Sequence, residues 1–255
     1  MKNSKIEWTT HTFNPWIGCS KCSKGCDNCY ACDMMDVRWK RALWGAAGTR
    51  LRTTPANWRN PLKWSKESES ARVFCASLAD VFENYKGDGS APDRPVSLDP
   101  WRHDLFDLIE KTPNLEWLLL TKRPQNAAKF LKKRLPGNLW IGTSVEDQKA
   151  ADQRIPHLAG IPAKVRFLSC EPLLGPLDLR PHLAGVDWVI VGGESGKSPR
   201  PMDPSWVRDI RDQCVAAGVA FLFKQWGGRN RKVAGRKIDG RIWNQIPMPH
   251  LAKAA

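Results

Sequence analysis

The stretch LEWLLLTKRPQNAAKFLKKRL, residues 115–135, contains the pattern that decides the fold. It begins with a run of consecutive apolar residues, which is typical of a strand buried on both faces, and the run ends in Lys122 and Arg123. Pro124 follows at a position that suits the first turn of a helix, and a helical pattern continues from it. A buried strand followed by a helix is the repeating unit of a parallel α/β sheet.

Similar apolar runs recur along the whole chain. Each holds four to six apolar or β-branched residues and ends in polar ones: RVFCASLAD (72–80), LWIGTSVED (139–147), VRFLSCEPL (165–173), DWVIVGGES (187–195) and AFLFKQWGG (220–228). The segment 6–14 alternates between polar and apolar residues and is a candidate first strand. We therefore expect six to seven strands.

Helical patterns lie between several of these runs, at 99–112, 146–160 and 203–218, and Asp99 is the expected N-cap of the first helix. Strands and helices at this spacing predict an α/β fold, in which parallel strands form a full or partial (β/α) barrel of the TIM type. A doubly wound open sheet is the alternative.

The domain organisation follows from the same pattern. No boundary between domains is visible, so we predict a single domain over residues 1–255. Long connections at about 46–71 and 82–98 are expected to be insertions on the rim of the barrel. Residues 227–255 are expected to be a basic C-terminal extension.

Composition narrows the class of protein. The chain has 40 Lys and Arg against 26 Asp and Glu, which gives a net charge of +14. We find no apolar run long enough to span a bilayer and no secretory leader, so we expect a cytoplasmic protein without membrane contact and, by default, a monomer. Cations gather at 36–72 and 224–241, in segments that we expect to be loops. Tryptophans lie within or beside them, at Trp58, Trp64, Trp226 and Trp243, which favours nucleic acid or a nucleotide-sized anion as partner.

Polar residues stand at the end of every predicted central strand. Because the carboxyl ends of parallel strands meet at one edge of a sheet, we expect these side chains to line a shared pocket. They are Ser77 and Asp80; Thr121, Lys122 and Arg123; Ser144 and Glu146; Glu171; Gly192, Gly193 and Glu194; and Lys224, Gln225 and Trp226.

The sequence GCSKCSKGCDNCYACD, residues 18–33, carries five of the eight cysteines and follows the candidate first strand. A reducing compartment disfavours disulfides. Four thiolates suit tetrahedral zinc, but a zinc ribbon has two cysteine pairs separated by a longer loop. The spacing also differs from the run of bacterial ferredoxins. A metal or cluster site at the same rim as the polar strand ends is the favoured reading of this stretch.

The subset Cys22-x3-Cys26-x2-Cys29 resembles the cysteine motif of the radical S-adenosylmethionine (radical SAM) superfamily. The wider chain, from about residue 6 to residue 247, is similar to an uncharacterised, phage-associated radical-SAM-like family. The residues that carry this likeness are FNPWIGCSKCSKGCDNCYA, LLLTKRP, WIGTSVEDQ, FLSCEPLLGPL, DWVIVGGESG, FLFKQWGG and IDGRIWNQIP.

The resemblance implies a radical SAM barrel with a [4Fe–4S] cluster held by three thiolates. S-adenosylmethionine would bind the fourth iron and yield a 5′-deoxyadenosyl radical, with an electron donor such as flavodoxin or ferredoxin. Cys26 and Cys29 would be ligands. Cys19 and Cys22 compete for the third place, and Cys19 is favoured because the family has an apolar residue at the position of Cys22.

The resemblance also implies roles for the strand ends. Ser77 or Asp80 would hold the methionyl amine, and Lys122 or Arg123 the methionyl carboxylate. The residues assigned to the cofactor are Tyr30, Ser77, Asp80, Thr121, Lys122, Ser144, Glu146, Gly192, Gly193 and Glu194. Arg123, Glu171 and Lys224 are the candidate catalytic residues, and Gln225 and Trp226 the candidate substrate-binding ones.

The predicted function is that of a radical SAM enzyme, of the isomerase, lyase or transferase type, acting on a nucleobase or a nucleotide-derived substrate. One form is the rearrangement of a decorated pyrimidine in phage DNA, in the host cytoplasm. A zinc- or cluster-stabilised nucleic-acid-binding protein without turnover is the alternative. A cluster with a structural or redox-sensing role is a third reading.

Overall fold

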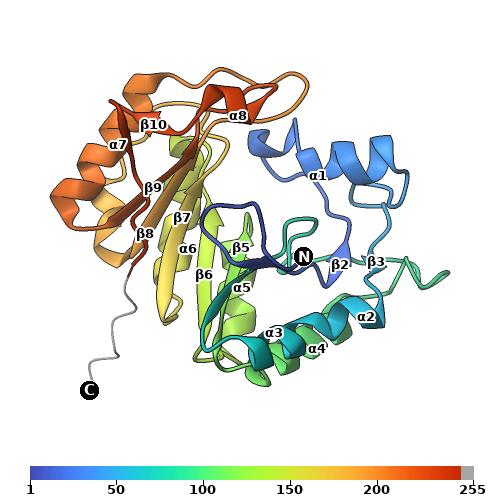
Figure 1. The fold of residues 1–255 in the computed structure, drawn as a ribbon. Coiled ribbons are helices and arrows are strands. Elements are labelled where there is room, and N and C mark those ends of the chain that lie inside the picture. Colours follow the sequence, from blue (N-terminus) through green and yellow to red (C-terminus); the bar gives the residue numbers. More distant parts are fainter. Residues whose placement is uncertain (248–255) are drawn as a thin grey trace. The chain divides into compact units, whose positions relative to one another are not determined.

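The computed structural model of the protein describes residues 1–247, apart from the side chains of residues 231 and 232. The backbone packs into two compact units, Met1–Trp140 and Ile141–Ala255, which Figure 1 shows in blue to green and in yellow to red. The last part of the predicted C-terminal extension, 248–255, lies outside the described residues.

The fold class is α/β with seven parallel strands, as the sequence predicted. The strands follow the order β1-β4-β5-β6-β7-β8-β9, in which neighbours in the sheet are also neighbours along the chain. This is the strand order of a partial (β/α) barrel. The doubly wound alternative is wrong, because its strand order reverses at a switch point.

The first unit contains β1 (His11–Thr12), β4 (Ala71–Cys75) and β5 (Leu115–Thr121), which pair in parallel. The candidate first strand at 6–14 is therefore only two residues long. Its flanks bond to the edge of β4 through single contacts, such as Thr10 N–H to the Arg72 carbonyl at 2.9 Å. The two longer strands bring their carboxyl ends, and so the polar residues that follow them, to one edge.

The helices of the first unit include two that the sequence did not predict. The stretch 46–71 was expected to be an open loop, but it holds α2 (Pro55–Trp58) and α3 (Asn60–Glu67). Thr54 caps α2, since its Oγ1 accepts from the Asn57 N–H at 3.3 Å, and prolines stand in the first turns. These signals are short and lie among loop-like residues, which is why periodicity missed them.

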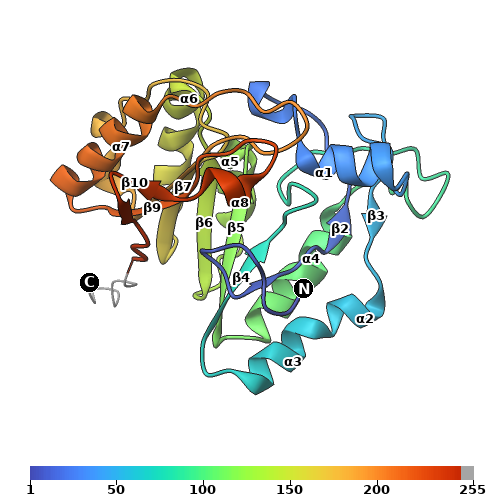
Figure 2. The same cartoon turned by 45° about the horizontal axis from the view of Figure 1, so that its top comes forward.

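The two predicted helices of this unit are present as α4 (Asp99–Glu110) and α5 (Pro124–Leu131). The predicted cap of α4 is wrong. Asp99 is the first residue of the helix, and its carboxylate pairs with Arg102 one turn later instead of capping. In both ribbon views α2, α3 and α4 lie together (Figures 1 and 2).

The cysteine-rich stretch is built on short helical pieces. It follows β2 (Trp16–Ile17), which pairs antiparallel with β3 (Leu51–Arg52). Next come the 3-10 turn η1 (Lys24–Cys26), the single turn α1 (Tyr30–Cys32) and the π-helical η2 (Asp33–Arg38). Both views place α1 beside the β2–β3 pair (Figures 1 and 2).

The second unit repeats the strand–helix pattern. Asp147 caps its first helix by accepting from the Ala150 N–H at 2.8 Å, and Gly218 ends the last long helix in the left-handed region, at φ 67°. Its elements are β6 (Leu139–Ser144, which begins in the first unit), α6 (Gln148–Ala159), β7 (Val165–Cys170), η3 (Arg180–Gly185), β8 (Trp188–Gly192), α7 (Pro204–Ala217), β9 (Ala220–Gln225), α8 (Arg231–Ala234), β10 (Lys237–Ile238) and β11 (Arg241–Ile242).

The core is made by the strands themselves. Every residue of β6 and of β8 is buried, as the continuous apolar runs predicted. Cys75, Cys170 and Cys214 are fully buried, which agrees with a structural role for these thiols. Among residues 1–247, no helix combines the length and the apolar character needed to cross a membrane.

Candidate functional site

The cysteine-rich stretch, residues 18–33, is here called the cysteine loop. All eight cysteines of the chain are free thiols. Within the loop, Cys22 is exposed, while Cys19, Cys26, Cys29 and Cys32 are half-buried. The loop therefore presents thiols that solvent, metal ions or a ligand can reach, in contrast to the three cysteines of the core.

The start of the cysteine loop is fixed by buried charges. The Arg50 side chain is fully buried and donates to both carboxylate oxygens of Glu83, each at 2.8 Å. Glu83 Oε1 also accepts from the Ser20 N–H, at 2.9 Å, and from the Ser20 hydroxyl. A bidentate pair of this kind has strong directional preference. It fixes the loop backbone directly after Cys19.

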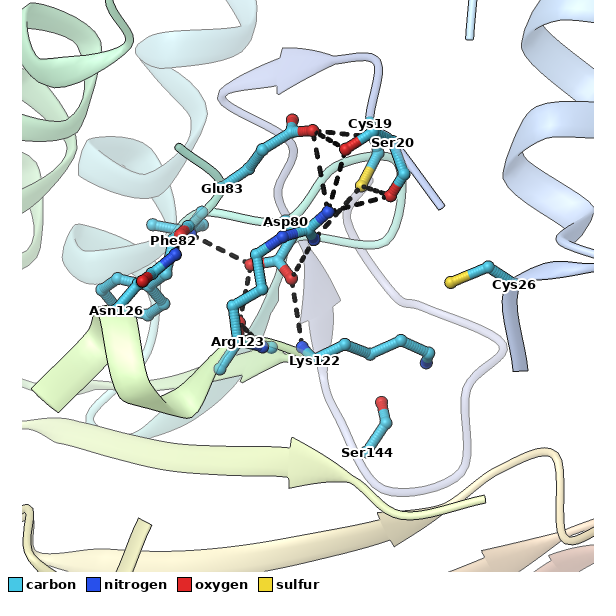
Figure 3. A network of polar contacts seen from close by, with 12 residues as sticks. Cys19, Ser20, Cys26, Asp80, Phe82, Glu83, Lys122, Arg123, Asn126 and Ser144 are labelled. Carbon is cyan, nitrogen blue, oxygen red and sulfur yellow. Dashed lines mark hydrogen bonds and ion pairs between the residues drawn. The ribbon is translucent and has the colours of Figure 1, made fainter. Parts of the chain in front are cut away.

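Arg123 completes this network from the end of β5. Its guanidinium donates to Asp80 Oδ2 at 2.9 Å and to the carbonyl and hydroxyl oxygens of Ser20, each at 3.0 Å. It also lies 3.9 Å from the sulfur of Cys19. Figure 3 shows Arg123 reaching from its strand to the loop, with Asp80 on one side and Glu83 on the other. We call Ser20, Arg50, Asp80, Glu83 and Arg123 the buried charge network.

Asp80 joins the ends of two strands. Its carboxylate accepts from Thr121 Oγ1 at 2.7 Å, from the Lys122 N–H at 3.1 Å and from the Phe82 N–H at 3.0 Å. With Arg123, these contacts use both carboxylate oxygens. The lysine side chain next to Arg123 extends in another direction (Figure 3), and its charge acts on Cys26.

The thiols of the loop differ in acidity. Burial, followed by the charges of Asp80 and Glu83, raises the pKa of Cys19 to about 12. Cys22 and Cys26 are hydrogen-bonded to each other through their side chains. This bond raises the pKa of Cys22 and lowers that of Cys26 to about 5, with Lys122 as a further cause. These contacts therefore favour the thiolate form of Cys26 and the neutral form of Cys19.

The cysteine loop fits a thiolate-bound metal or cluster in the kind and number of its ligands. There are four cysteines from Cys19 to Cys29, and the pKa of one of them, Cys26, is lowered by its neighbours. Their side chains stand as free thiols, and residues 1–247 hold no group of three or more His, Cys, Asp or Glu placed close enough together to bind a metal ion. The Cys22–Cys26 contact is the one part of a ligand set that the geometry brings together.

Other predicted residues gather beside the cysteine loop. The Tyr30 hydroxyl donates to the Ser77 carbonyl at 2.7 Å, and the Ser77 hydroxyl accepts from Asn14 Nδ2 at 3.1 Å. These contacts tie α1 to the chain that follows β4. The first unit thus brings together Tyr30, Ser77, Asp80, Thr121, Lys122 and Arg123 with the four cysteines.

In the second unit, the ends of β7, β8 and β9 bring a different set together. Lys224 Nζ lies 2.9 Å from Glu171 Oε1, and the Ser169 hydroxyl donates to Glu171 Oε2 at 3.2 Å. Both charged side chains are mostly buried, at 14% and 18% exposed. A Cβ on Gly192 would lie 2.7 Å from Glu171 Oε1, so the glycine leaves the space in which the carboxylate lies.

The remaining predicted residues of this unit have partners of their own. The Gly193 N–H donates to the Gln225 carbonyl at 3.0 Å, and a Cβ on Gly193 would lie 2.1 Å from the Trp226 carbonyl oxygen. The Gln225 amide donates to the Ser195 hydroxyl. Trp226 Nε1 donates to the Lys237 carbonyl at 2.9 Å, which ties the indole to β10. These residues make a close-packed turn at the end of β9.

Glu146 and Glu194 are each committed to an arginine. Arg154 pairs with Glu146 and donates to the Ser144 carbonyl at 2.8 Å. Arg200 donates to Glu194 Oε2 through its N–H and its Nε, each at 2.9 Å. Both carboxylates are buried. Their assignment to the cofactor stays a prediction, and in this structure they hold the loops after β6 and β8.

Sequence reasoning missed Ser20, Arg50, Glu83, Arg154 and Arg200. Arg50 was counted among the cations of an exposed basic loop, which is wrong, because its guanidinium is fully buried against Glu83. The sequence did carry a signal for Glu83, because SLADVFE has a second carboxylate three residues after Asp80. Trp64 was placed with the tryptophans suited to base stacking, but it is buried and stacks on His11 at 4.4 Å.

Comparison with known proteins identifies a family without a known activity. The family model described as "Protein of unknown function (DUF5131)" matches residues 3–247. No curated protein and no solved structure matches the chain. The predicted membership of the radical SAM superfamily is therefore wrong, because the match that covers nearly the whole chain is to a different family. Three cysteines at a fixed spacing are too short a motif to assign a superfamily.

Proposed function

Because this chain belongs to the DUF5131 family, whose function is unknown, we propose a function from its own residues. The cysteine loop holds an iron–sulfur cluster, and the protein is an enzyme that uses it with S-adenosylmethionine on a nucleobase or nucleotide-derived substrate. The observation that carries this proposal is the cysteine loop itself. It has four cysteines from Cys19 to Cys29, and a buried charge network fastens it to the ends of two parallel strands.

The ligands in this proposal are Cys26, Cys29 and one further cysteine. The sequence favoured Cys19 for the third place, whereas the side-chain geometry supports Cys22. The Cys22 thiol already contacts Cys26, while the Cys19 thiol bonds to the carbonyl of Ser20 at 3.4 Å, beside Arg123. In this assignment Cys19 lies next to the ligand set, where the buried charge network fixes its backbone.

A bound cluster of this kind supplies one electron to reductive cleavage of the sulfonium of S-adenosylmethionine. The chain supplies the charges that would orient the ligand. Lys122 and Arg123 directly follow β5, Arg123 lies beside the cysteine loop, and a carboxylate is bound well by such cations. Arg123 is already held by Asp80 and Ser20. We therefore assign the methionyl carboxylate to Lys122, whose charge is near enough to Cys26 to lower the pKa of that thiol.

The polar group of the second unit is assigned to the substrate. Glu171 and Lys224 make a carboxylate–ammonium pair at the carboxyl ends of β7 and β9, where α/β folds carry their chemistry. The carboxylate of such a pair can accept a proton or a hydrogen bond from a neighbouring atom, and the ammonium group can donate one. Gln225 and Trp226 are the candidate binding residues next along the chain.

A nucleic acid partner, a cytoplasmic setting and a small electron donor such as flavodoxin or ferredoxin complete the proposal. The net charge of +14 supports a polyanionic partner. Free thiols throughout the chain agree with a reducing compartment.

A second candidate function is a zinc- or cluster-stabilised nucleic-acid-binding protein without turnover. The Cys22–Cys26 pair favours it, because two cysteines separated by three residues also suit zinc. Metal content and cleavage of S-adenosylmethionine together separate the two candidates. About one zinc per chain supports the binding protein, whereas about four irons support the enzyme only if S-adenosylmethionine is also cleaved.

The test of the enzyme is cleavage of S-adenosylmethionine by anaerobically purified protein under a strong reductant. We expect release of methionine and 5′-deoxyadenosine, and loss of that release together with the bound iron in Cys26→Ser and Cys29→Ser. Cys32→Ser is the matched control, because Cys32 lies in the same loop, is half-buried and lies outside the assigned ligand set. Iron-loaded protein that leaves S-adenosylmethionine intact would contradict the proposal.

A further inference from the structure

Five consecutive residues at the end of η2 and just beyond it, Val37–Arg41 with the sequence VRWKR, are all exposed. We call them the VRWKR segment. Trp39 is 54% exposed, and it is the only one of the thirteen tryptophans, all within the described residues, whose class is exposed. Val37 is 60% exposed. Both ribbon views show the helical stretch that starts at α1 on the outside of the first unit (Figures 1 and 2).

The exposure of Trp39 is imposed by a pinned backbone. Its N–H donates to the Met34 carbonyl at 3.1 Å, and the Arg41 N–H donates to the Met35 carbonyl at 2.7 Å. Met35 and Ala42 are buried against Ile17 in a small apolar cluster. The chain therefore buries the residues on both sides of the segment while it holds the indole outward. Lys40 adopts a left-handed backbone at φ 48°, which non-glycine residues rarely do.

The segment is basic. Arg38, Lys40 and Arg41 are exposed, and the Arg41 guanidinium lies 5.6 Å from the centre of the Trp39 ring, within the range of a cation–π contact. Asp33 pairs with Arg38, and Asp36 accepts from the Trp44 N–H at 2.8 Å, so the nearby carboxylates are engaged. Lys21 and Lys24 are exposed on the adjoining cysteine loop.

An exposed indole between cations matches one class of partner. Single-stranded nucleic acid presents phosphates to lysine and arginine, and open base faces to an aromatic ring. A duplex hides the base faces. An anionic membrane would be met by an amphipathic helix with a continuous apolar face, whereas here charged and apolar residues alternate over a short pinned loop. An acidic protein would use the cations and leave the indole unmatched.

We propose that the VRWKR segment binds single-stranded nucleic acid, with Trp39 as the platform on which a base stacks and Lys40 and Arg41 on the phosphates. This deepens the proposed function and rests on its nucleic-acid part, since it names a polymer and not a free nucleotide as the partner. It does not depend on the cluster.

The test is fluorescence anisotropy with a labelled single-stranded oligonucleotide of mixed sequence, over a range of salt concentrations. We expect Trp39→Ala to weaken binding about 5- to 150-fold, the range measured for base–aromatic stacking, and Trp39→Phe to retain most of the affinity. Lys40→Ala with Arg41→Ala is expected to lower the slope of log affinity against log salt by about 1.4, since each single-strand phosphate contact contributes about 0.7.

Lys132→Ala with Lys133→Ala is the matched control, because it removes two exposed cations from the same unit at the end of α5. We expect it to bind within about twofold of the unchanged protein. Equal binding of the strand by the unchanged protein and Trp39→Ala would overturn the proposal, and so would equal losses in the control. Binding to anionic vesicles but not to the oligonucleotide would overturn it in favour of a membrane surface.

Iron counts on the same samples keep this test separate from the proposed function. Protein that holds iron but binds no strand overturns the VRWKR proposal alone. If the protein holds no iron but its strand binding depends on Trp39, the result supports the VRWKR proposal and contradicts the proposed iron–sulfur cluster. Thermal melts of each variant establish that it is folded, which the exposed positions of all the substituted side chains favour.

Discussion

The strand ends of the two units each carry a carboxylate and a cation, and the two pairs differ in their surroundings. In the first unit, Asp80 and Arg123 are 7% and 11% exposed and share contacts with Ser20, Thr121 and the chain around them. In the second unit, Glu171 and Lys224 have a 2.9 Å contact with each other, with Ser169 as a further partner of the carboxylate. The Asp80–Arg123 pair belongs to a network that holds the cysteine loop, whereas the Glu171–Lys224 pair has few other partners.

This difference teaches that position at a strand end does not by itself make a residue catalytic. Asp80 and Arg123 of the first unit each have several hydrogen-bond partners. Their removal should therefore mainly lower the free energy of unfolding and disorder the cysteine loop. The charges of the second unit have fewer partners, so their removal should cost little stability and act on chemistry instead. Four measurements can break or sharpen this comparison.

The largest expected effect is at Glu83. Replacing it with alanine leaves the fully buried Arg50 without its bidentate partner, and breaking a buried pair costs about 3–5 kcal/mol of unfolding free energy. Urea denaturation measures it. The matched control is Lys2→Ala, which removes the exposed Lys2–Glu67 pair and should leave stability close to that of the unchanged protein. A Glu83 variant as stable as that control would break the comparison.

The next effect separates two adjacent glycines in the second unit. Gly193→Ala should cost about 3 kcal/mol, because the new methyl group meets the Trp226 carbonyl, which is backbone and cannot turn aside. Gly192→Ala should cost about 1 kcal/mol, because its obstacle is the flexible end of Glu171. Thermal unfolding of the two variants measures the difference. Equal costs would mean that the Glu171 carboxylate is held as rigidly as the backbone.

A smaller change in stability is expected at Lys224. Lys224→Met keeps the length of the side chain and removes its charge, and the partly solvated Glu171 should tolerate this at about 1–2 kcal/mol. Arg123→Met, the equivalent change in the first unit, should cost about 3–5 kcal/mol. If denaturation gave the same loss for both variants, the two strand ends would not differ in the way described.

The smallest effect concerns the acidity of Cys26. Its folded pKa of about 5 lies below the ordinary thiol value of 9.0. The stabilisation from its thiolate is therefore complete above pH 9 and is lost as the pH falls through 5. In metal-free protein, iodoacetamide should alkylate Cys26 at pH 6–7 and leave Cys19 unmodified, as peptide mass spectrometry can measure. Equal labelling of the two thiols would contradict the assigned contacts.

Much of the fold could be predicted because buried parallel strands leave a direct signal. The runs that contain Leu115–Thr121 and Val165–Cys170 are mostly apolar, with a charged residue only at the second position, and polar residues follow each of them. The division into two compact units and the helices α2 and α3 left no such signal. Long connections are held by individual contacts between particular residues. Such contacts do not repeat at a regular spacing, so the sequence pattern does not reveal them.

Some members of the candidate site were predictable, but their pairing was not. Asp80 and Arg123 were identified from their place after β4 and β5, but their use in holding Ser20 depends on Glu83 and Arg50, which lie in irregular segments. The spacing of the cysteines indicated a metal or cluster. It could not tell that Cys22 contacts Cys26 while Cys19 lies beside Arg123, because that depends on how the loop folds.

The central claim is that the cysteine loop holds an iron–sulfur cluster that meets S-adenosylmethionine. The most direct measurement is an electron paramagnetic resonance spectrum of anaerobically purified, reduced protein, with iron and sulfide counts, before and after S-adenosylmethionine is added. We expect about four irons per chain and a spectrum that changes when S-adenosylmethionine is added. Zinc in place of iron, or a cluster whose spectrum is the same with and without S-adenosylmethionine, would contradict it.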